Sequence, residues 1–225
     1  MCGRFSIDTD SATVRQQFKA ESFGPLPVSS NVAPTENALC VIKSDEGLIA
    51  LPLRWGIIPW YKKDKKPPLL INARAESVAE KPAFKQSLKY RRCLVLMSGF
   101  FEWSHHEKTP TKQPFFISSP KKELLAVAAL WDTIKLTKNM TIPACCLLTV
   151  DANPSVTFLH DRMPWILTPD EQQDWLNPEE FREDNLNCLL ENPVAESLIS
   201  YPVTPKMNSA LYKEKDCIKP LLNDN

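Results

Sequence analysis

Several features that would place a chain in a special class are scarce here. The 225 residues include only 5 glycines and 3 histidines, and Lys+Arg equal Asp+Glu at 27 each. A formal net charge of zero argues against a generally adhesive basic protein. No apolar run approaches the ~18 residues that a membrane span needs, and the N-terminus lacks a basic-then-apolar signal pattern. We therefore expect a protein that is not secreted and has no membrane partner.

Paired cysteine motifs are also missing. The chain has 7 cysteines, an odd number, with no Cys-x-x-Cys pair. This pattern favours reduced thiols over a disulfide framework or a zinc site, so we expect no metal and no cofactor. Five cysteines lie in apolar runs and are interpreted as inert core residues: Cys40, Cys93, Cys145, Cys146 and Cys188.

The composition, with 43% hydrophobic and 24% charged residues, is that of an ordinary globular protein, and one domain over residues 1–225 is the simplest count. Two strands, 38–43 and 48–55, are expected to pair around the turn at 44–47. Four apolar runs predict core strands: Cys93–Met97, Pro114–Ser118, Leu124–Leu130 and Ile142–Val150.

Helix signals are short and scattered. The pattern predicts a helix over Thr9–Ala20 and another from about Pro82 to Tyr90. Further short helices are expected after Asn153-Pro154, Thr168-Pro169 and Asn177-Pro178. The sum is an α+β fold, a β-rich single domain with a strongly bent or barrel-like mixed sheet and peripheral helices.

The N-terminus begins Met1-Cys2-Gly3-Arg4. Methionine before a small residue is normally removed, which would leave Cys2 with a free α-amine beside its thiol. An α-amine has a pKa of roughly 7.7–8.0, against about 10.4 for lysine, so more of it is neutral and nucleophilic near pH 7. Such a pair can close on an aldehyde as a thiazolidine ring, or the amine can act as base for the thiol. The alternative is an incidental cysteine in a frayed terminus.

Acid–base candidates are few. His105 and His106 lie in a polar loop and are interpreted as solvated. His160 stands in a charged triplet between apolar residues, where it is either a functional or a structural hydrogen-bonded histidine. Glu102 is flanked by aromatic residues, whose burial would raise its pKa and suit it to proton transfer. An edge glutamate that points to solvent is the alternative for Glu102.

Two further stretches suggest contact with an anionic polymer. Asn72 and Arg74 share a face if residues 70–76 are extended, and they suit an oxyanion and a phosphate. Trp60 and Tyr61 adjoin four lysines, a pattern suited to stacking on bases and neutralising phosphates. A core tryptophan followed by a solvated lysine run explains the second pattern equally.

Together the motifs resemble the SOS response-associated peptidase (SRAP) family of abasic-site-processing proteins. The matching pieces, in order, are Met1-Cys2-Gly3-Arg4-Phe5, Asn31-Val32-Ala33-Pro34, Trp55-Gly56 with Pro59-Trp60, Ile71-Asn72-Ala73-Arg74-Ala75-Glu76, Gly99-Phe100-Phe101-Glu102-Trp103, His160-Asp161-Arg162-Met163-Pro164, and the segment from Pro202 to Asn208.

The resemblance implies that Cys2, after loss of Met1, attaches through amine and thiol to the ring-opened sugar of an abasic site in single-stranded DNA. It also implies three assisting residues: Glu102 as acid–base group, Asn72 as the residue that orients the cysteine or the sugar oxygens, and His160 as an aid to proton transfer. The implied DNA contacts are Arg4, Arg74 and Arg162 on phosphates, and Trp60 and Tyr61 on bases.

The resulting hypothesis is a DNA-crosslinking enzyme of the DNA damage response, with lyase-like and self-processing peptidase-like activity. Its expected setting is the cytoplasm, or the nucleoid in a prokaryote, as a monomer that meets replication-fork proteins. A cysteine peptidase with Cys2 as nucleophile, His160 as base and Asn72 in an oxyanion role is the first alternative. A non-catalytic single-strand binder that uses Trp60 and the lysines is the second.

Overall fold

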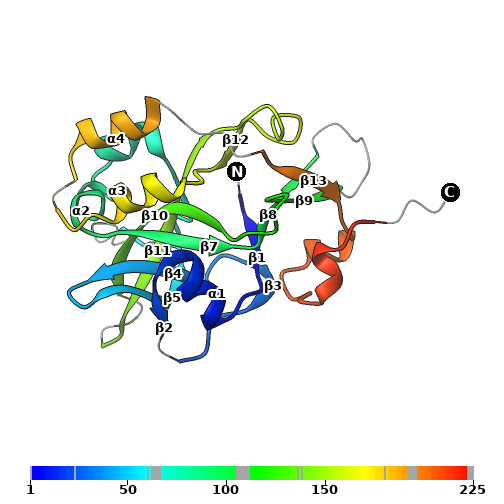
Figure 1. Ribbon diagram of the computed structural model, residues 1–225, viewed down its shortest axis with the longest axis horizontal. Coiled ribbons are helices and arrows are strands. Elements are labelled where there is room, and N and C mark those ends of the chain that lie inside the picture. The colour runs from blue at the N-terminus through cyan, green and yellow to red at the C-terminus, as the bar shows by residue number, and fades with distance from the viewer. Residues whose placement is uncertain are drawn as a thin grey trace.

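A barrel and a second β-sheet make up most of the fold in this computed structural model, drawn in Figure 1. The structure describes residues 2–22, 24–59, 61, 67–104, 112–135, 137, 139–179, 181–191 and 197–221. Within these residues, no helix is long and apolar enough to cross a membrane.

The barrel is built from the larger sheet, in which five strands form a closed ring. The ring runs β5–β4–β7–β10–β11, and β11 returns to β5 through the parallel pairs Ala144↔Arg54 and Cys145↔Trp55. The five strands are β4 (Asn37–Ser44), β5 (Gly47–Trp55), β7 (Arg92–Met97), β10 (Leu125–Lys135) and β11 (Thr141–Asp151). Three short strands extend this sheet: β2 (Glu21–Ser22), β6 (Asn72–Arg74) and β12 (Arg162–Pro164).

The second sheet contains the N-terminal strand. Its order is β13–β9–β8–β1–β3, with every pair antiparallel. The strands are β1 (Arg4–Ile7), β3 (Ser29–Val32), β8 (Gly99–Trp103), β9 (Pro114–Ser118) and β13 (Ile199–Pro202). One face of this sheet joins the main core through residues such as Phe100 and Ile117. The other face, with Phe101 and Phe116, packs on the C-terminal segment through Met207 and Cys217.

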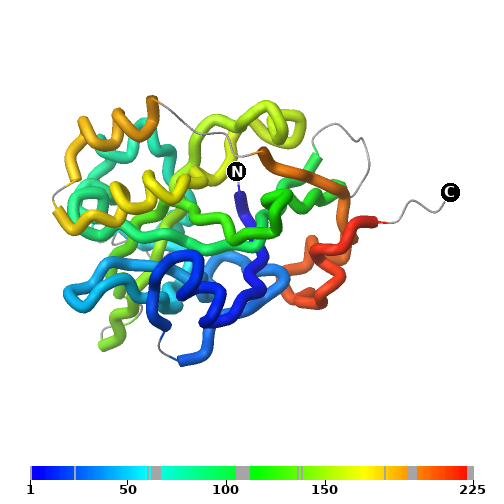
Figure 2. The backbone as a smooth tube through the Cα atoms, in the orientation of Figure 1, coloured from blue at the N-terminus to red at the C-terminus, as the bar shows by residue number. Residues whose placement is uncertain are grey.

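Helices lie around the outside of the barrel, as Figure 2 shows. They are α1 (Ser11–Phe18), α2 (Lys85–Tyr90), α3 (Pro169–Leu176) and α4 (Glu183–Glu191), with the 3-10 helix η1 (Ala75–Glu80). The 3-10 helices η2 (Pro205–Asn208) and η3 (Lys215–Ile218) pack on the second sheet instead. The predicted cap of α3 is present as a capping box, in which the side chain of Thr168 accepts from the backbone N–H of Glu171. The prediction of a β-rich, barrel-like mixed sheet with peripheral helices is confirmed.

Local strand predictions are also confirmed. β4 and β5 pair in register from Asn37↔Arg54 to Ser44↔Gly47, so the turn at 44–47 lies where it was expected. The four predicted core strands correspond to β7, β9, β10 and β11. Four strands of the second sheet, β1, β3, β8 and β13, were not predicted, because they are only four or five residues long and lie in irregular sequence.

One predicted helix is absent. Residues 154–159 form turns instead, since the side chain of Asn153 accepts from the backbone N–H of Ser155 and the loop closes through Ala152 N to Asp161 O. The helix predicted to follow Asn177-Pro178 is present as α4, but it begins only at Glu183. The carbonyls of Asn177 and Glu179 accept hydrogen bonds from the buried guanidinium of Arg92 rather than from a following helical turn.

One cysteine prediction is also wrong. Cys188 is exposed, whereas Cys40, Cys93, Cys145 and Cys146 are buried as expected. Cys188 lies on α4, where Leu186 is buried in the core and Leu189 and Leu190 pack against it. A residue two positions along a helix points roughly 200° away from its neighbour, so Cys188 faces solvent.

Candidate active site

Cys2 lies two residues before β1, inside the main core rather than in a frayed terminus. It is fully buried, and its thiol donates a 3.4 Å hydrogen bond to the backbone carbonyl of Arg4. Burial, and then the negative charge of Glu102, raise the pKa of the Cys2 thiol far above its usual 9.0. The thiol is therefore neutral near pH 7, and Glu102 is close enough to act on it.

Asn72, in β6 of the larger sheet, contacts the backbone of Cys2. Its side-chain amide donates a 2.8 Å hydrogen bond to the backbone carbonyl of Cys2. Strand β6 is held in place by its parallel pairing with β11 and by Trp55, whose indole N–H donates to the carbonyl of Ile71 at 3.0 Å. Among the described residues, the buried Asn72 Oδ1 has no hydrogen-bond partner. This leaves an acceptor beside the first residues of the chain.

Glu102 comes from the neighbouring strand of the second sheet. Because Arg4 pairs with Phe101, Glu102 lies opposite the segment that precedes Arg4. Glu102 is 4% exposed, and burial raises the pKa of its carboxyl above the usual 4.5. The positive charge of the chain's α-ammonium group and a hydrogen bond from the Trp103 backbone lower this pKa in part, and the charge of Asp161 raises it. The desolvation predicted from the flanking aromatic residues is confirmed.

Close packing of β8 against β9 depends on Gly99. A side chain at Gly99 would collide with the ring of Phe116 and the backbone carbonyl of Ile117. Glycine at this position therefore lets the strand that carries Glu102 approach its neighbour.

His160 is held by its own turn. Its Nδ1 lies 2.6 Å from Asp161 Oδ1 and 2.9 Å from the backbone N of Arg162. A protonated Nδ1 donates to the Asp161 carboxylate, whereas an unprotonated Nδ1 accepts from the Arg162 N–H, so the two contacts are alternatives and either one orients the ring. Since the charge of Asp161 acts on the pKa of Glu102, the turn at 160–162 lies within electrostatic reach of Glu102.

Two of the three predicted phosphate ligands have internal partners. Arg162 is buried and makes a bidentate ion pair with Glu76 at 2.8 and 2.9 Å, a second ion pair with Asp151 and a hydrogen bond to the carbonyl of Thr149. Arg4 donates to Asn31 Oδ1 at 3.0 Å and to the carbonyls of Met207 and Asn208. These contacts indicate that both residues hold the site together.

Arg74 differs from the other two arginines. It is exposed, and its side chain makes no hydrogen bond or ion pair with the described part of the chain. It lies two residues after Asn72 in β6, so both side chains leave the same face of the strand. Tyr61 is 40% exposed, while Trp60 and the two histidines at 105 and 106 lie outside the described residues.

Sequence reasoning missed the role of Asn31. Its fully buried side chain accepts from Arg4 and donates to three backbone carbonyls in the C-terminal segment, those of Met207, Ser209 and Tyr212. Asn31 lies in β3, and it thus ties β3, and through Arg4 also β1, to a segment about 180 residues further along the chain. The available signal was the motif Asn31-Val32-Ala33-Pro34, which gave no role to the asparagine.

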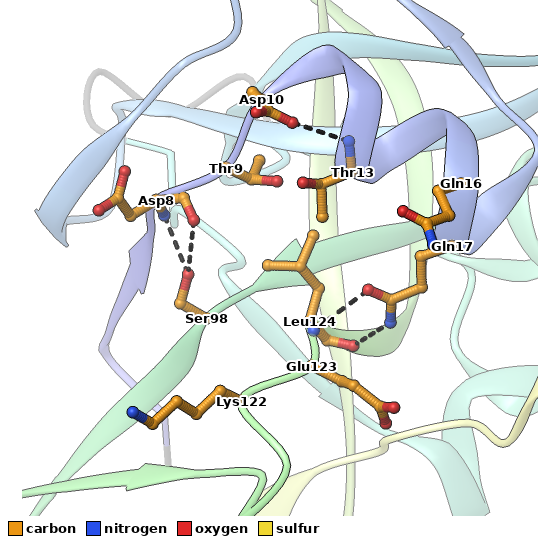
Figure 3. A pocket seen from close by; sticks show the side chains of 10 residues that line it. All are labelled: Asp8, Thr9, Asp10, Thr13, Gln16, Gln17, Ser98, Lys122, Glu123 and Leu124. Carbon is orange, nitrogen blue, oxygen red and sulfur yellow. Dashed lines mark hydrogen bonds between the residues drawn. The ribbon is translucent and has the colours of Figure 1, made fainter.

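A cavity of about 780 Å³ lies elsewhere, beyond the other end of β1 (Figure 3). Its polar groups bond to one another: Asp8 N to Ser98 Oγ, Thr13 N to Asp10 Oδ1, and Gln17 Nε2 to Leu124 O. We assign no site to this cavity. In the described residues, no group of three or more His, Cys, Asp or Glu side chains is placed to hold a metal ion.

Comparison with known proteins places the chain among relatives. Over 213 residues it is 35% identical to "Abasic site processing protein YoqW" of Bacillus subtilis (strain 168). This alignment covers 93% of this chain and 95% of that protein. It is 29% identical over 202 residues to "Abasic site processing protein HMCES" of Rattus norvegicus, which covers 76% of this chain and 57% of that protein.

Solved structures show the same fold. A crystal structure of a protein from Bacteroides thetaiotaomicron matches with a TM-score of 0.82 and 21% identity, covering 98% of this chain and all of that chain. A protein from Bordetella bronchiseptica matches with a TM-score of 0.74 and 20% identity, covering 90% of this chain and all of that chain. The model of the family "SOS response associated peptidase (SRAP)" matches residues 1–210. This chain therefore belongs to the SRAP family.

Proposed function

We propose that the protein processes abasic sites in single-stranded DNA by forming a covalent thiazolidine through Cys2, after removal of Met1. The observation that carries the proposal is the convergence of Cys2, Asn72 and Glu102 from three different strands or strand ends. The printed names of the relatives, abasic site processing proteins, support the substrate class.

The state of the thiol favours one order of steps. Because burial keeps the Cys2 thiol neutral, the α-amine is the stronger first nucleophile. It attacks the aldehyde carbon of the opened sugar, and the resulting carbinolamine loses water to give an imine. The thiol then adds to the imine carbon while its proton passes to the nitrogen, which closes the ring. One water molecule leaves, and no oxidant or reductant is needed.

Glu102 suits the proton transfers of this sequence. With a raised pKa, its carboxyl is available in both protonation states nearer neutral pH than an ordinary glutamate. Protonated, it donates to the sugar oxygen during ring opening and to the departing hydroxyl of the carbinolamine; ionised, it takes the proton of the thiol. His160 is the second proposed proton-transfer group, with its ring oriented through Nδ1.

Asn72 keeps the nucleophile in place. Its amide N–H holds the Cys2 carbonyl, and its Oδ1 remains as an acceptor for an N–H of the Cys2 amine. Fixing the carbonyl restricts rotation of the first residue, so that amine and thiol meet the same carbon.

For binding the strand we propose Arg74 as the principal phosphate contact, because it is exposed and shares a face with Asn72. Stacking by Trp60 and Tyr61 stays a prediction. The predicted phosphate contacts of Arg4 and Arg162 also remain predictions, and their internal partners favour a positioning role.

The cysteine peptidase alternative needs a thiolate at Cys2, which burial disfavours. Peptidase-like activity is accordingly proposed only for removal of Met1. The non-catalytic binder alternative predicts no covalent product, so a single experiment separates it from the crosslinking enzyme.

The test is incubation with single-stranded DNA that carries one abasic site, followed by a denaturing gel and intact-mass measurement. We expect a protein without Met1 and an adduct whose mass is that of protein plus DNA minus one water. Cys2→Ala should abolish the adduct, while Cys188→Ala, at the exposed cysteine, should leave it unchanged. A stable adduct from Cys2→Ala would refute the N-terminal mechanism.

A further inference from the structure

Phe115 and Phe158 form an aromatic pair at the edge of the candidate active site. Their ring centroids are 5.9 Å apart and the rings are nearly perpendicular, at 87°. Phe115 lies in β9, and Phe158 lies in the turn that leads to His160. In Figure 2 this turn lies beside the end of β9.

The register of the second sheet places the pair next to Glu102. Glu102 and Phe115 are direct cross-strand partners, so their side chains leave the same face of the sheet. Phe115 is in turn the partner of Pro202 in β13. Glu102, Phe115 and Pro202 therefore form a row across three strands toward the sheet edge, and Phe158 packs on Phe115, the middle residue of this row.

Phe158 is unusual in its exposure. Its side chain is 48% exposed, whereas the other phenylalanines in the described part of the chain are buried or half-buried. A phenyl ring has no polar group to satisfy in water, and Phe158 makes an edge-to-face contact with Phe115. An aromatic surface is thus kept accessible two residues from His160.

We propose that the Phe115–Phe158 pair is a stacking platform for a nucleobase that flanks the abasic site. This inference rests on the proposed function. The lesion itself has no base, so its strand must be positioned through neighbouring nucleotides. Aromatic faces accept any base, which suits a protein that reads the absence of a base rather than a sequence. Stacking on Phe158 aligns the sugar of the adjacent nucleotide with Glu102 and Cys2.

The experiment measures binding without covalent chemistry. The probe is a fluorescent single strand with a central tetrahydrofuran, a baseless sugar that cannot open to an aldehyde. Three forms of the probe are used: normal bases on both sides, a second spacer on the 5′ side, and a second spacer on the 3′ side. Wild type, Phe158→Ala, Phe158→Leu and Tyr90→Ala are compared; Tyr90 is 56% exposed on α2 and serves as the matched control.

We expect Phe158→Ala and Phe158→Leu to weaken binding to the normal probe about ten-fold, as the loss of one stacked base predicts. Wild type should lose a similar factor when the base is removed on one side, and both variants should be insensitive to that removal. Tyr90→Ala should behave as wild type. Phe158→Leu preserves the apolar contact with Phe115, so wild-type binding by this variant would show that Phe158 serves packing alone and would overturn the proposal.

Equal sensitivity of the variants and wild type to both spacers would also overturn it. These results are independent of crosslinking. If wild type fails to crosslink a true abasic site, the proposed function fails, whereas the stacking measurement still decides the role of Phe158.

Discussion

The side-chain amide of Asn72 donates a 2.8 Å hydrogen bond to the backbone carbonyl of Cys2. The two residues are 70 positions apart: Asn72 lies in β6 of the larger sheet, and Cys2 lies just before β1 of the second sheet. The bond joins these sheets at the point where the proposed chemistry takes place.

Replacing Asn72 tests this link. Asn72→Ala removes the donor and should slow adduct formation by about 10²-fold, because a nucleophile displaced by about 1 Å loses its alignment. Unfolding free energy should fall by about 1–3 kcal/mol, since the buried Cys2 carbonyl is left without its donor. Asn72→Asp should be slower still, because it sets a carboxylate oxygen against the carbonyl. Denaturing gels measure the rate of adduct formation, and urea titrations measure the unfolding free energy. Wild-type rates of adduct formation in both Asn72 variants would contradict the positioning role.

Glu102→Gln tests proton transfer. The amide keeps the shape of the side chain but cannot exchange a proton, so adduct formation should slow by ~10²–10⁴. Reversal of a preformed adduct should slow as well, because the same group works in both directions. Binding to intact single-stranded DNA should match wild type. If the variant crosslinks at the wild-type rate, Glu102 is structural and His160 becomes the leading acid–base candidate.

Glu102→Gln should also change how the unfolding free energy depends on pH. Because the pKa of Glu102 is raised above 4.5, the folded state favours the protonated carboxyl and is destabilised when the carboxyl ionises. This loss is absent below pH 4.5 and grows as the pH rises through 4.5 toward the folded-state value. Relative to wild type, Glu102→Gln should therefore gain unfolding free energy with increasing pH. Denaturant titrations from pH 4 to 8 measure the difference; a constant difference would mean that the folded-state pKa is not raised.

Arg162→Met distinguishes positioning from phosphate contact. The variant loses the bidentate pair with Glu76 and the bond to the Thr149 carbonyl. Glu76 and Asp151 have side chains 46% and 90% exposed, so they can return to water, and the cost should be about 1–3 kcal/mol rather than that of a fully buried pair. Adduct formation should slow while the salt dependence of DNA binding stays at the wild-type slope. A smaller slope would instead assign Arg162 to a phosphate.

Arg74→Ala should behave in the opposite way. The residue is exposed, so the melting temperature should not change. Loss of one phosphate contact on a single strand should reduce the slope of log affinity against log salt by about 0.7. Arg182→Ala, which removes an exposed arginine just before α4, is the control. Identical slopes for the two variants would remove Arg74 from the DNA-binding surface.

Local patterns account for the parts of the fold that were predicted well. The β4–β5 hairpin, the core strands and the capping box of α3 depend on residues within about ten positions of one another. The absent helix after Asn153-Pro154, the late start of α4 and the exposed Cys188 show the limit of this reasoning. Asn177-Pro178 is a sound helix start by itself, yet the carbonyl of Asn177 accepts a hydrogen bond from Arg92, which is 85 residues away in the chain.

The sequence by itself determined the chemistry that is available: an aminothiol after Met1, a carboxyl among aromatic residues, and motifs that resemble one family. Only the tertiary structure decided which groups meet. The pairing of β5 with β11, the bond from Asn72 to Cys2, the ion pair of Arg162 with Glu76 and the contact of Phe115 with Phe158 each join distant segments. Such contacts follow from how sheets close and pack around a shared core, which no local periodicity encodes.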